Sequence, residues 1–258
     1  MTYPMAAPVA TQPHPSTAAV AAVDLVKVYG SGDTAVRALD GVSVGFDRAA
    51  FTAIMGPSGS GKSTLMHCLA GLDTATSGRA LLGGTDLTRL SDRVLTKVRR
   101  ERIGFVFQSF NLLHQLTAAE NITLPLSLAG RAPDRRLYDH LVSVLGLGDR
   151  LSHRPSELSG GQQQRVAVAR ALVGRPEVVF ADEPTGNLDS RSGAEVLSFL
   201  RTSVRDLGQT VVMVTHDPAA AAYADRVVVL ADGRIAGEIH APTRASVTEA
   251  LQNIGERR

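Results

Sequence analysis

One octapeptide, Gly56-Pro57-Ser58-Gly59-Ser60-Gly61-Lys62-Ser63, sets the expectations for the rest of this 258-residue chain. It fits the pattern G-x-x-x-x-G-K-[ST], in which glycines let backbone N–H groups curl around a phosphate that side chains would block. A buried-type strand, Phe51–Met55, precedes the octapeptide, and helical spacing begins at Lys62. The positive end of that helix is directed at the same point. Strand, loop and helix in this order predict a nucleotide-binding loop rather than a flexible glycine–serine linker.

The polar side chains of this loop indicate how a nucleotide would be held. Lys62 can bridge the outer phosphates, and the Ser63 hydroxyl can ligate Mg²⁺. Only three of the 27 basic residues are lysines (Lys27, Lys62 and Lys97), so a lysine at this position is informative. The loop residues expected to contact the nucleotide are Gly56, Ser58, Gly59, Ser60, Gly61, Lys62, Ser63 and Thr64.

A second set of chemically active side chains follows an apolar strand. Residues 178–181 are apolar, and Asp182 and Glu183 come directly after them. A strand buried beside the loop would bring Asp182 near the metal ion and Glu183 near the γ-phosphate. One carboxylate suits Mg²⁺, and the other can polarise the attacking water. Taken alone, the pair is better explained as a strand that ends in solvated acids. Its coexistence with the lysine loop favours the catalytic interpretation.

The pattern of apolar residues predicts an α/β fold. Residues 23–29 and 36–46 have short-strand patterns, and a tight turn at Asp40-Gly41 predicts an antiparallel β layer near the N-terminus. From residue 162 onward strands and helices alternate, which implies a largely parallel sheet covered by helices. The expected elements are helices 162–173 and 192–207 and strands 178–181, 210–215 and 226–230.

The remaining segments divide the chain into an arm, an insertion and a tail. Residues 1–21 are rich in Ala, Pro and Thr and predict a flexible N-terminal arm. The main domain is expected at 22–240, with loops and helices of an inserted α-helical subdomain at about 109–160. The segment 241–258 is expected to be a C-terminal tail with one short helix.

Composition and charge exclude several classes of protein. Hydrophobic residues make up 44% and charged residues 20%, which is typical of a soluble globular protein. The net charge of +2, from 27 basic and 25 acidic side chains, is too balanced to argue for nucleic-acid binding. The single cysteine, Cys68, excludes an internal disulfide and a cysteine-cluster metal site. The longest uncharged stretch, 1–23, carries four prolines, so we expect neither a membrane-spanning helix nor a secretory signal, and we place the chain inside the cell.

The segment Leu158-Ser159-Gly160-Gly161-Gln162, followed by Gln163-Gln164-Arg165, points to a family. It resembles the signature of ABC-type ATPases, and the order of loop, glutamine, signature, acidic strand and histidine resembles that family from residue 23 to 237. Without the family, the serine and glycines before a helix indicate either a second anion-binding helix N-terminus or a mere helix cap. One loop already suffices for one nucleotide, so a second anion site suggests a nucleotide held by another copy of the chain.

The resemblance implies roles for residues that match the family's motifs. Tyr29 would stack on adenine, Gln108 would sense Mg²⁺ and the attacking water, and His216 would contact the γ-phosphate. By themselves, a strand-end tyrosine, a solvated glutamine and a structural histidine are the ordinary interpretations. Asp189 lies where the family's loop crosses to the opposite subunit.

The complete set implied by the resemblance has three parts. The implied catalytic residues are Glu183, His216 and Gln108. The implied metal ligands are Ser63, Gln108 and Asp182. The implied nucleotide contacts outside the loop are Tyr29, Ser159, Gly160, Gly161, Gln162 and Asp189. The implied cofactors are ATP and Mg²⁺.

The resemblance also implies a fold and a branch of the family. The implied fold is an α/β P-loop NTPase core with a mostly parallel sheet, an N-terminal antiparallel β layer and the inserted α-helical subdomain. The segments 110–113 and 185–189 look like the branch that serves macrolide export, lipoprotein extraction and cell division. Ala49-Ala50 departs from the Gly-Glu that relatives commonly carry before the strand, and no catalytic role depends on it.

A mechanism follows from the same resemblance. Two copies would meet head to tail as a homodimer around two ATP molecules, an arrangement natural for a two-fold axis. The chain would be an ATPase that drives a separate integral membrane permease of the export type. The alternative is a regulatory or mechanotransmitting ATPase that acts on a membrane protein without moving cargo across the bilayer.

The expected partners and location are those of such a subunit. The surface around residues 108–122 would receive a coupling helix of the permease. The chain would sit peripherally at the cytoplasmic face of the cell membrane, and a periplasmic or extracytoplasmic adaptor is a further candidate partner. An ABC ATPase acting on nucleic acid is disfavoured, because such chains typically carry two ATPase units or long coiled-coil insertions.

Overall fold

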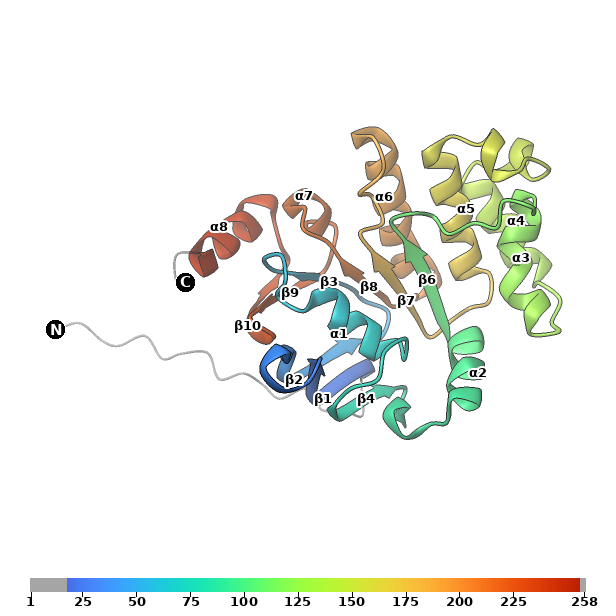
Figure 1. The fold of residues 1–258 in the computed structure, drawn as a ribbon. Helices are drawn as coiled ribbons and strands as arrows, with labels where there is room; N and C mark the ends of the chain where they lie inside the picture. Colours follow the sequence, from blue (N-terminus) through green and yellow to red (C-terminus); the bar gives the residue numbers. More distant parts are fainter. Residues whose placement is uncertain (1–17, 256–258) are drawn as a thin grey trace.

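Two β-sheets with a helix between them organise residues 18–255, the part of the chain that the computed structural model describes. The larger sheet has six strands in the order β10-β9-β3-β8-β7-β6, and the smaller has four in the order β2-β1-β4-β5. Helix α1 (Lys62–Leu69) contacts β1, β2 and β4 of the smaller sheet and β8 of the larger one. Figure 1 shows α1 lying between the two sheets.

The six-stranded sheet is the largely parallel core that the sequence predicts. β3 pairs in parallel with β8 and β9, β8 with β7, and β7 with β6, whereas β10 runs antiparallel to β9. Its strands are β3 (Phe51–Met55), β6 (Ile103–Phe107), β7 (Val178–Asp182), β8 (Val211–Val214), β9 (Arg226–Ala231) and β10 (Arg234–His240). Together with the second, antiparallel sheet and the covering helices, this arrangement confirms the predicted α/β fold class.

Both faces of the six-stranded sheet are covered. In β7, Phe180 packs among side chains of α1 and the smaller sheet, whereas the next residue, Ala181, packs among the helices on the opposite face. Continuous apolar strands of this kind are typical of parallel sheets buried on both sides. Residues that follow β3, β6, β7 and β8 emerge together at the carboxyl edge of the sheet, which is where α/β folds place their ligands.

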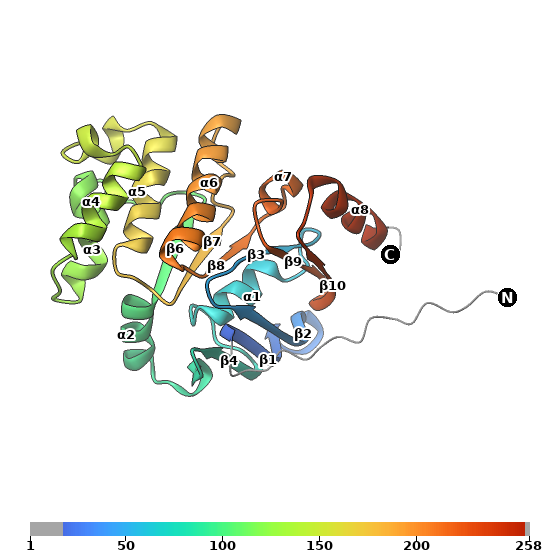
Figure 2. The same ribbon diagram turned by 180° about the vertical axis from the view of Figure 1, so that it is seen from behind.

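The helices that cover the face of the six-stranded sheet opposite α1 lie mostly toward one end of the molecule. α3 (Ala118–Leu128) and α4 (Arg135–Val144) lie within the range 109–160 and stand beside α5 (Gly160–Leu172), away from the smaller sheet (Figures 1 and 2). The remaining helices are α2 (Asp92–Arg102), α6 (Ser190–Leu207), α7 (Pro218–Ala221) and α8 (Arg244–Gly255). None of the helices within residues 18–255 combines the length and the apolar character needed to cross a bilayer.

Strand β1 (Ala18–Tyr29) corrects one prediction. Residues 18–21 belong to this strand and are buried, whereas the sequence placed them in a flexible arm that ends at residue 21. Alanine has a low strand propensity, so the local composition gave no strand signal. Pairing with β2 on one side and β4 (Ser77–Leu82) on the other overrides that propensity. Residues 1–17 of the predicted arm lie outside the described residues.

Strand β2 (Val36–Asp47) corrects a second prediction. The strand is continuous, so the prediction of a tight turn at Asp40-Gly41 is wrong. These two residues instead lie opposite the single residue Val26 of β1, which makes a β-bulge, and Gly41 has the positive φ of +70°. The backbone N–H of Asp40 donates to the carbonyl of Gly233, so the bulge links the two sheets. The smaller sheet is completed by β5 (Thr85–Asp86), and the sequence predicted no strand at β4, β5 or β10.

Candidate functional site

The predicted phosphate-binding loop joins β3 to α1 and has room only for glycine at two positions. A Cβ on Gly56 would lie 1.9 Å from the carbonyl oxygen of Leu230 at the end of β9. A Cβ on Gly61 would lie 2.3 Å from the carbonyl oxygen of Ala38 in β2. Both glycines have positive φ, +149° and +97°, which L side chains rarely adopt. The loop is therefore pressed against two neighbouring strands, with its backbone exposed as a cradle that fits a phosphate group.

Lys62, the first residue of α1, folds across this cradle. Its Nζ donates to the carbonyl oxygens of Gly56 at 3.0 Å and Pro57 at 2.8 Å. Burial lowers the pKa of Lys62, and the nearby carboxylates of Glu183 and Asp182 act in the opposite direction. The ammonium thus rests on neutral carbonyls of the loop while it faces two acids, a position from which it can reach an anion in the cradle.

Asp182 is the last residue of β7 and Glu183 follows it, so both acids lie at the predicted strand end, although β7 is not the neighbour of β3. Strand β8 lies between them, so the acids stand one strand further from the loop than the sequence analysis assumed. Burial raises the pKa of Asp182, and the charges of His67 and Lys62 oppose that rise. His67, on α1, has its Nε2 3.9 Å from a carboxylate oxygen of Asp182. No motif indicates His67, and only the helical register of α1 could have placed it near the acid.

Glu183 is held in an unusual backbone conformation beside His216. Its φ of +47° lies in the left-handed region, which costs a non-glycine residue free energy and is most often kept at functional sites. Its N–H donates to the carbonyl of Val214 on β8 at 2.9 Å. Its side chain meets His216, whose Nδ1 lies 2.9 Å from Oε1 of Glu183. The structure thus brings the predicted base and the predicted histidine into contact.

Gln108 follows β6 on the other side of β7. Because Phe107 and Asp182 are register partners, Gln108 and Glu183 emerge from adjacent strand ends. The Nε2 of Gln108 donates to Asn187 at 3.2 Å, and Asn187 donates back to the carbonyl of Gln108 at 3.1 Å. A side chain on Gly186 would collide with that amide, since its Cβ would lie 2.7 Å from Nε2. Asn187 thereby orients Gln108, a contact that the sequence analysis missed.

The loop after Gln108 is fixed by Arg170 of α5. Phe110 and Asn111 both have positive φ, +60° and +50°. The Arg170 guanidinium donates to the carbonyl oxygens of both residues, at 2.9 Å and 2.5 Å. Burial lowers the pKa of Arg170, and the two carbonyls satisfy its donors. No sequence pattern indicated this contact, because it joins residues about sixty positions apart.

Tyr29 ends β1 close to the start of α1. Its hydroxyl donates to Asp73 at 2.5 Å and contacts Thr64. The Nζ of Lys27 lies 4.6 Å from the centroid of its ring, a cation–π contact. Burial raises the pKa of Tyr29, and Asp73 adds to the rise. The residue is still 42% exposed, so a flat ligand can reach it.

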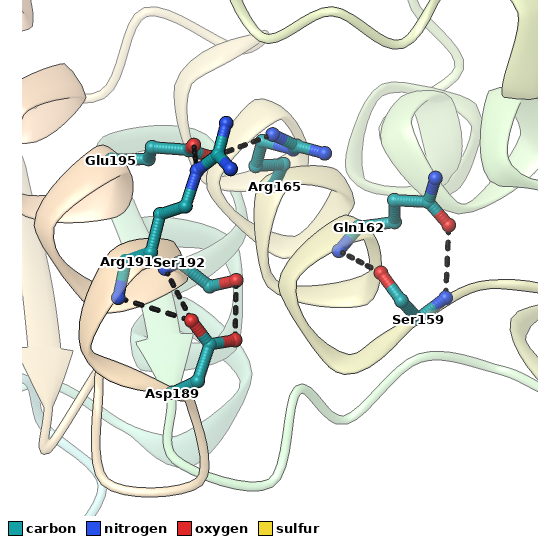
Figure 3. A network of polar contacts seen from close by, with 7 residues as sticks. All are labelled: Ser159, Gln162, Arg165, Asp189, Arg191, Ser192 and Glu195. Atoms are coloured by element: carbon teal, nitrogen blue, oxygen red, sulfur yellow. Dashed lines mark hydrogen bonds and ion pairs between the residues drawn. The ribbon is translucent and has the colours of Figure 1, made fainter.

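The signature residues form a second group of helix N-termini. Ser159 caps α5: its Oγ accepts from the N–H of Gln162 at 3.3 Å, and the Gln162 side chain accepts from the N–H of Ser159 at 2.9 Å. Asp189 caps α6 in a similar way and accepts from the N–H groups of Arg191 and Ser192, each at 3.0 Å. The hydrogen bonds from Ser192 hold the pKa of Asp189 below its usual value. Figure 3 shows the two caps.

The two helix N-termini pack closely. A Cβ on Gly161 would lie 2.8 Å from the hydroxyl of Ser192, so a side chain at this position would have to displace Ser192 where the helices meet. A Cβ on Gly160 would make only ordinary contacts, the nearest being 3.6 Å from the ring of Phe110. The capping box at Ser159 confirms that the pentapeptide is a helix cap.

The predicted site residues fall into two places along the sheet. Lys62, Asp182, Glu183, His216 and Gln108 lie at the carboxyl edge of the six-stranded sheet. The signature begins α5, which packs on β6, whereas the loop follows β3. Three strand spacings, about 14 Å, separate β3 from β6. A single chain therefore presents a cradle and a separate, second helix N-terminus.

The residues available for a metal ion suit Mg²⁺. Within the described range, no group of three or more His, Cys, Asp and Glu side chains could hold a metal by itself. Mg²⁺ is usually bound by one or two carboxylates together with substrate phosphates and water, so such a group is not required. Asp182, a serine hydroxyl and an amide oxygen are the hard oxygen ligands that this ion prefers.

Comparison with known proteins places these features in a family. The family model described as ABC transporter matches residues 39–186. An uncharacterized ABC transporter ATP-binding protein of Thermotoga maritima is 50% identical over 217 residues, which cover 83% of this chain and 92% of that protein. The macrolide export ATP-binding/permease protein MacB of Hyphomonas neptunium is 50% identical over 214 residues. That match covers 82% of this chain and 33% of the Hyphomonas protein, so the chain spans about a third of that relative.

Solved structures agree with this placement. The dimeric, post-hydrolysis state of the ATP-binding cassette MJ0796, bound to ADP and Pi, has a TM-score of 0.78 and 39% sequence identity, covering 87% of this chain and 99% of that one. The cbiO1 protein of Clostridium perfringens, part of the transporter complex cbiONQ, has the same TM-score with 28% identity and covers 93% of this chain and 96% of its own. The resemblance inferred from the signature is confirmed.

Proposed function

The chain belongs to the ABC transporter family, whose cassettes are ATPases, and on that premise we propose that it hydrolyses ATP at the interface of a head-to-tail homodimer to drive a membrane permease. One observation carries the dimer: the cradle follows β3, whereas the signature begins α5, a helix that packs on β6, three strands further along the sheet. A second copy related by a two-fold axis can supply its signature to the cradle of the first. Each site would then be built from both copies.

At each site, different residues would bind the phosphates, the base and the metal ion and accept the proton. The backbone of the cradle and Lys62 bind the phosphates, and Tyr29 stacks on the base. Glu183 accepts a proton from the attacking water and is held in place by its strained backbone and by His216. Mg²⁺, held by Ser63, Asp182 and Gln108, would supply charge neutralisation at the β- and γ-phosphate oxygens. From the other copy, Gly160 and Gly161 would present helix N–H groups to the γ-phosphate, and Ser159 its hydroxyl. The capping box with Gln162 would hold this turn in place, and Asp189 would line the same interface.

The homodimer is tested with Ser159→Arg. Ser159 is exposed, so the larger side chain has room and blocks the approach of the partner's cradle, while the loss of the Ser159 cap should lower Tm only modestly. In a Glu183→Gln background we expect the unmodified signature to give an ATP-dependent dimer by size-exclusion chromatography with light scattering, and Ser159→Arg to stay monomeric. The ATP Kd of the monomer should change by less than about threefold, because the chain's own cradle is untouched.

Two controls separate a loss of the head-to-tail interface from a general effect of the added cation. Ser91→Arg introduces the same cation at the exposed N-cap of α2 and should dimerise normally. A mixture of Lys62→Ala and Ser159→Arg chains, each inactive alone, should regain hydrolysis, because the mixed dimer contains one site with both groups intact. A Ser159→Arg chain that still dimerises with ATP would contradict the head-to-tail arrangement.

We propose a membrane permease as the partner on independent grounds. The name of the Hyphomonas relative joins an ATP-binding and a permease function, which supports an export-type membrane partner. Leu113, 46% exposed, and Phe110 lie in the loop that Arg170 fixes, and they offer an apolar surface to a coupling helix. We expect the full chain, purified from detergent-solubilised membranes, to carry a multi-span membrane protein in stoichiometric amount. Recovery of RNA or DNA in its place would contradict this assignment.

A further inference from the structure

A buried glutamine lies between the two catalytic loops and takes no part in the functions assigned so far. Gln164, in the second turn of α5, is fully buried. Its Nε2 donates to the carbonyl of Phe107 at 3.2 Å and to the carbonyl of Pro184 at 2.5 Å. Both hydrogens of the amide nitrogen are therefore used on backbone atoms of segments that are far apart in the sequence.

These two carbonyls belong to residues next to the predicted catalytic side chains. Phe107 immediately precedes Gln108, and Pro184 immediately follows Glu183. One side-chain nitrogen thus sets the separation between the end of β6 and the turn after β7, and with it the spacing of the predicted water-sensing amide and the predicted base. Both carbonyls point at the same donor, so neither segment can shift without breaking a buried hydrogen bond.

The acceptor of the same side chain has no partner. Within the described residues, Oε1 of Gln164 is buried and makes no hydrogen bond. A buried unsatisfied oxygen lowers stability, and an apolar side chain of similar length would avoid that loss. Packing alone therefore does not account for a glutamine at this position. The two donated hydrogen bonds account for the glutamine.

We propose that Gln164 is a positioning residue that holds Gln108 and Glu183 at their working distance and links both to the signature helix. This inference rests on the proposed hydrolysis at Glu183. Since Ser159 caps α5 five residues before Gln164, a movement of the signature against a partner's nucleotide is passed through the Gln164 amide to both catalytic loops. Occupation of one site would in this way bear on the catalytic geometry of the other.

The chain offers a matched control in Gln209. This glutamine is also buried, and its Nε2 also donates to two backbone carbonyls, those of Pro176 at 3.1 Å and Thr210 at 3.2 Å. It lies at the amino ends of β7 and β8, opposite the catalytic edge. Replacing it removes the same kind of hydrogen bonds without touching the loops that carry Gln108 and Glu183.

The experiment compares Gln164→Met with Gln209→Met in the full chain. For Gln164→Met we expect kcat for ATP to fall at least tenfold while the ATP Kd, measured by equilibrium fluorescence titration, stays within twofold. For Gln209→Met, which loses its two donated hydrogen bonds, we expect a fall in Tm with kcat within twofold of the unmodified chain. An unchanged kcat in Gln164→Met, or an equal loss in both variants, would overturn the positioning role.

Two additions keep the outcome interpretable. Gln164→Asn keeps an amide one methylene shorter, which cannot span both carbonyls, and it should give the same kinetic split if Gln164→Met does not fold. In a Glu183→Gln background, Gln164→Met should cause a smaller loss of hydrolysis than in the unmodified chain, because Glu183, one of the two groups that it positions, is already gone. Normal hydrolysis by Glu183→Gln alone would refute the proposed function, whereas an active Gln164→Met beside an inactive Glu183→Gln refutes only the positioning role.

Discussion

Glu183→Gln is expected to leave ATP binding intact and to lower kcat by about 10²–10⁴-fold, the usual contribution of a general base. The amide keeps the size and the hydrogen-bonding oxygen of the carboxylate but does not accept the proton of the attacking water. The substitution also keeps a side chain of the same length at a backbone with φ of +47°, so the strained turn after β7 should persist. Because the γ-phosphate would then stay in place, an ATP-bound dimer should accumulate.

The measurement combines steady-state hydrolysis with size-exclusion chromatography in ATP. Glu101→Gln is the matched control: it makes the same acid-to-amide change at a surface pair with Arg100 on α2, and its kcat should be within twofold of the unmodified chain. Hydrolysis at the normal rate by Glu183→Gln would show that another group accepts the proton. In that case His216, which contacts the carboxylate at 2.9 Å, becomes the residue to replace next.

Lys62→Ala is expected to weaken ATP binding roughly 10- to 100-fold, which corresponds to the loss of one charged hydrogen bond to phosphate. In the structure the ammonium is held on the carbonyls of Gly56 and Pro57, at the centre of the cradle. Alanine removes that cation and leaves the two carbonyls facing the site, where they would repel an anion. Both effects act in the same direction.

The loss is measured by equilibrium titration with a fluorescent ATP analogue. Lys97→Ala provides the control, since Lys97 is an exposed lysine on α2 far along the chain, and its removal should leave the Kd unchanged. The thermal midpoint of Lys62→Ala should also be recorded, because Lys62 makes hydrogen bonds within the loop. An unchanged Kd in Lys62→Ala with a folded protein would place the phosphates elsewhere.

Local sequence patterns predicted the elements whose form depends on their own residues. The octapeptide, the apolar strand before Asp182 and the serine cap of α5 each contain the glycines, β-branched residues or capping groups that their conformations require. The alternation of strands and helices after residue 162 was enough to predict a parallel sheet. These are the parts in which local propensity and the tertiary fold agree.

The features that the sequence analysis missed depend on contacts between distant segments. The strand at residues 18–21 exists because β2 and β4 flank it, and the bulge at Asp40-Gly41 exists because it meets the backbone of Gly233. Arg170 and Gln164 lie in a helix that was predicted, but the backbone atoms that they bind are about sixty and twenty to sixty residues away. No periodicity in a single sequence reports such pairs.

The close approach of the octapeptide to its neighbours has a consequence for protein engineering. The carbonyl of Leu230 in β9 constrains the backbone at Gly56, and the carbonyl of Ala38 in β2 constrains it at Gly61. Grafting these eight residues onto a foreign scaffold would transfer the sequence of the motif without the neighbouring strands that fix its backbone conformation. A transplant that retains affinity for triphosphates must therefore carry portions of three strands, or a redesigned surface that reproduces their backbone outline.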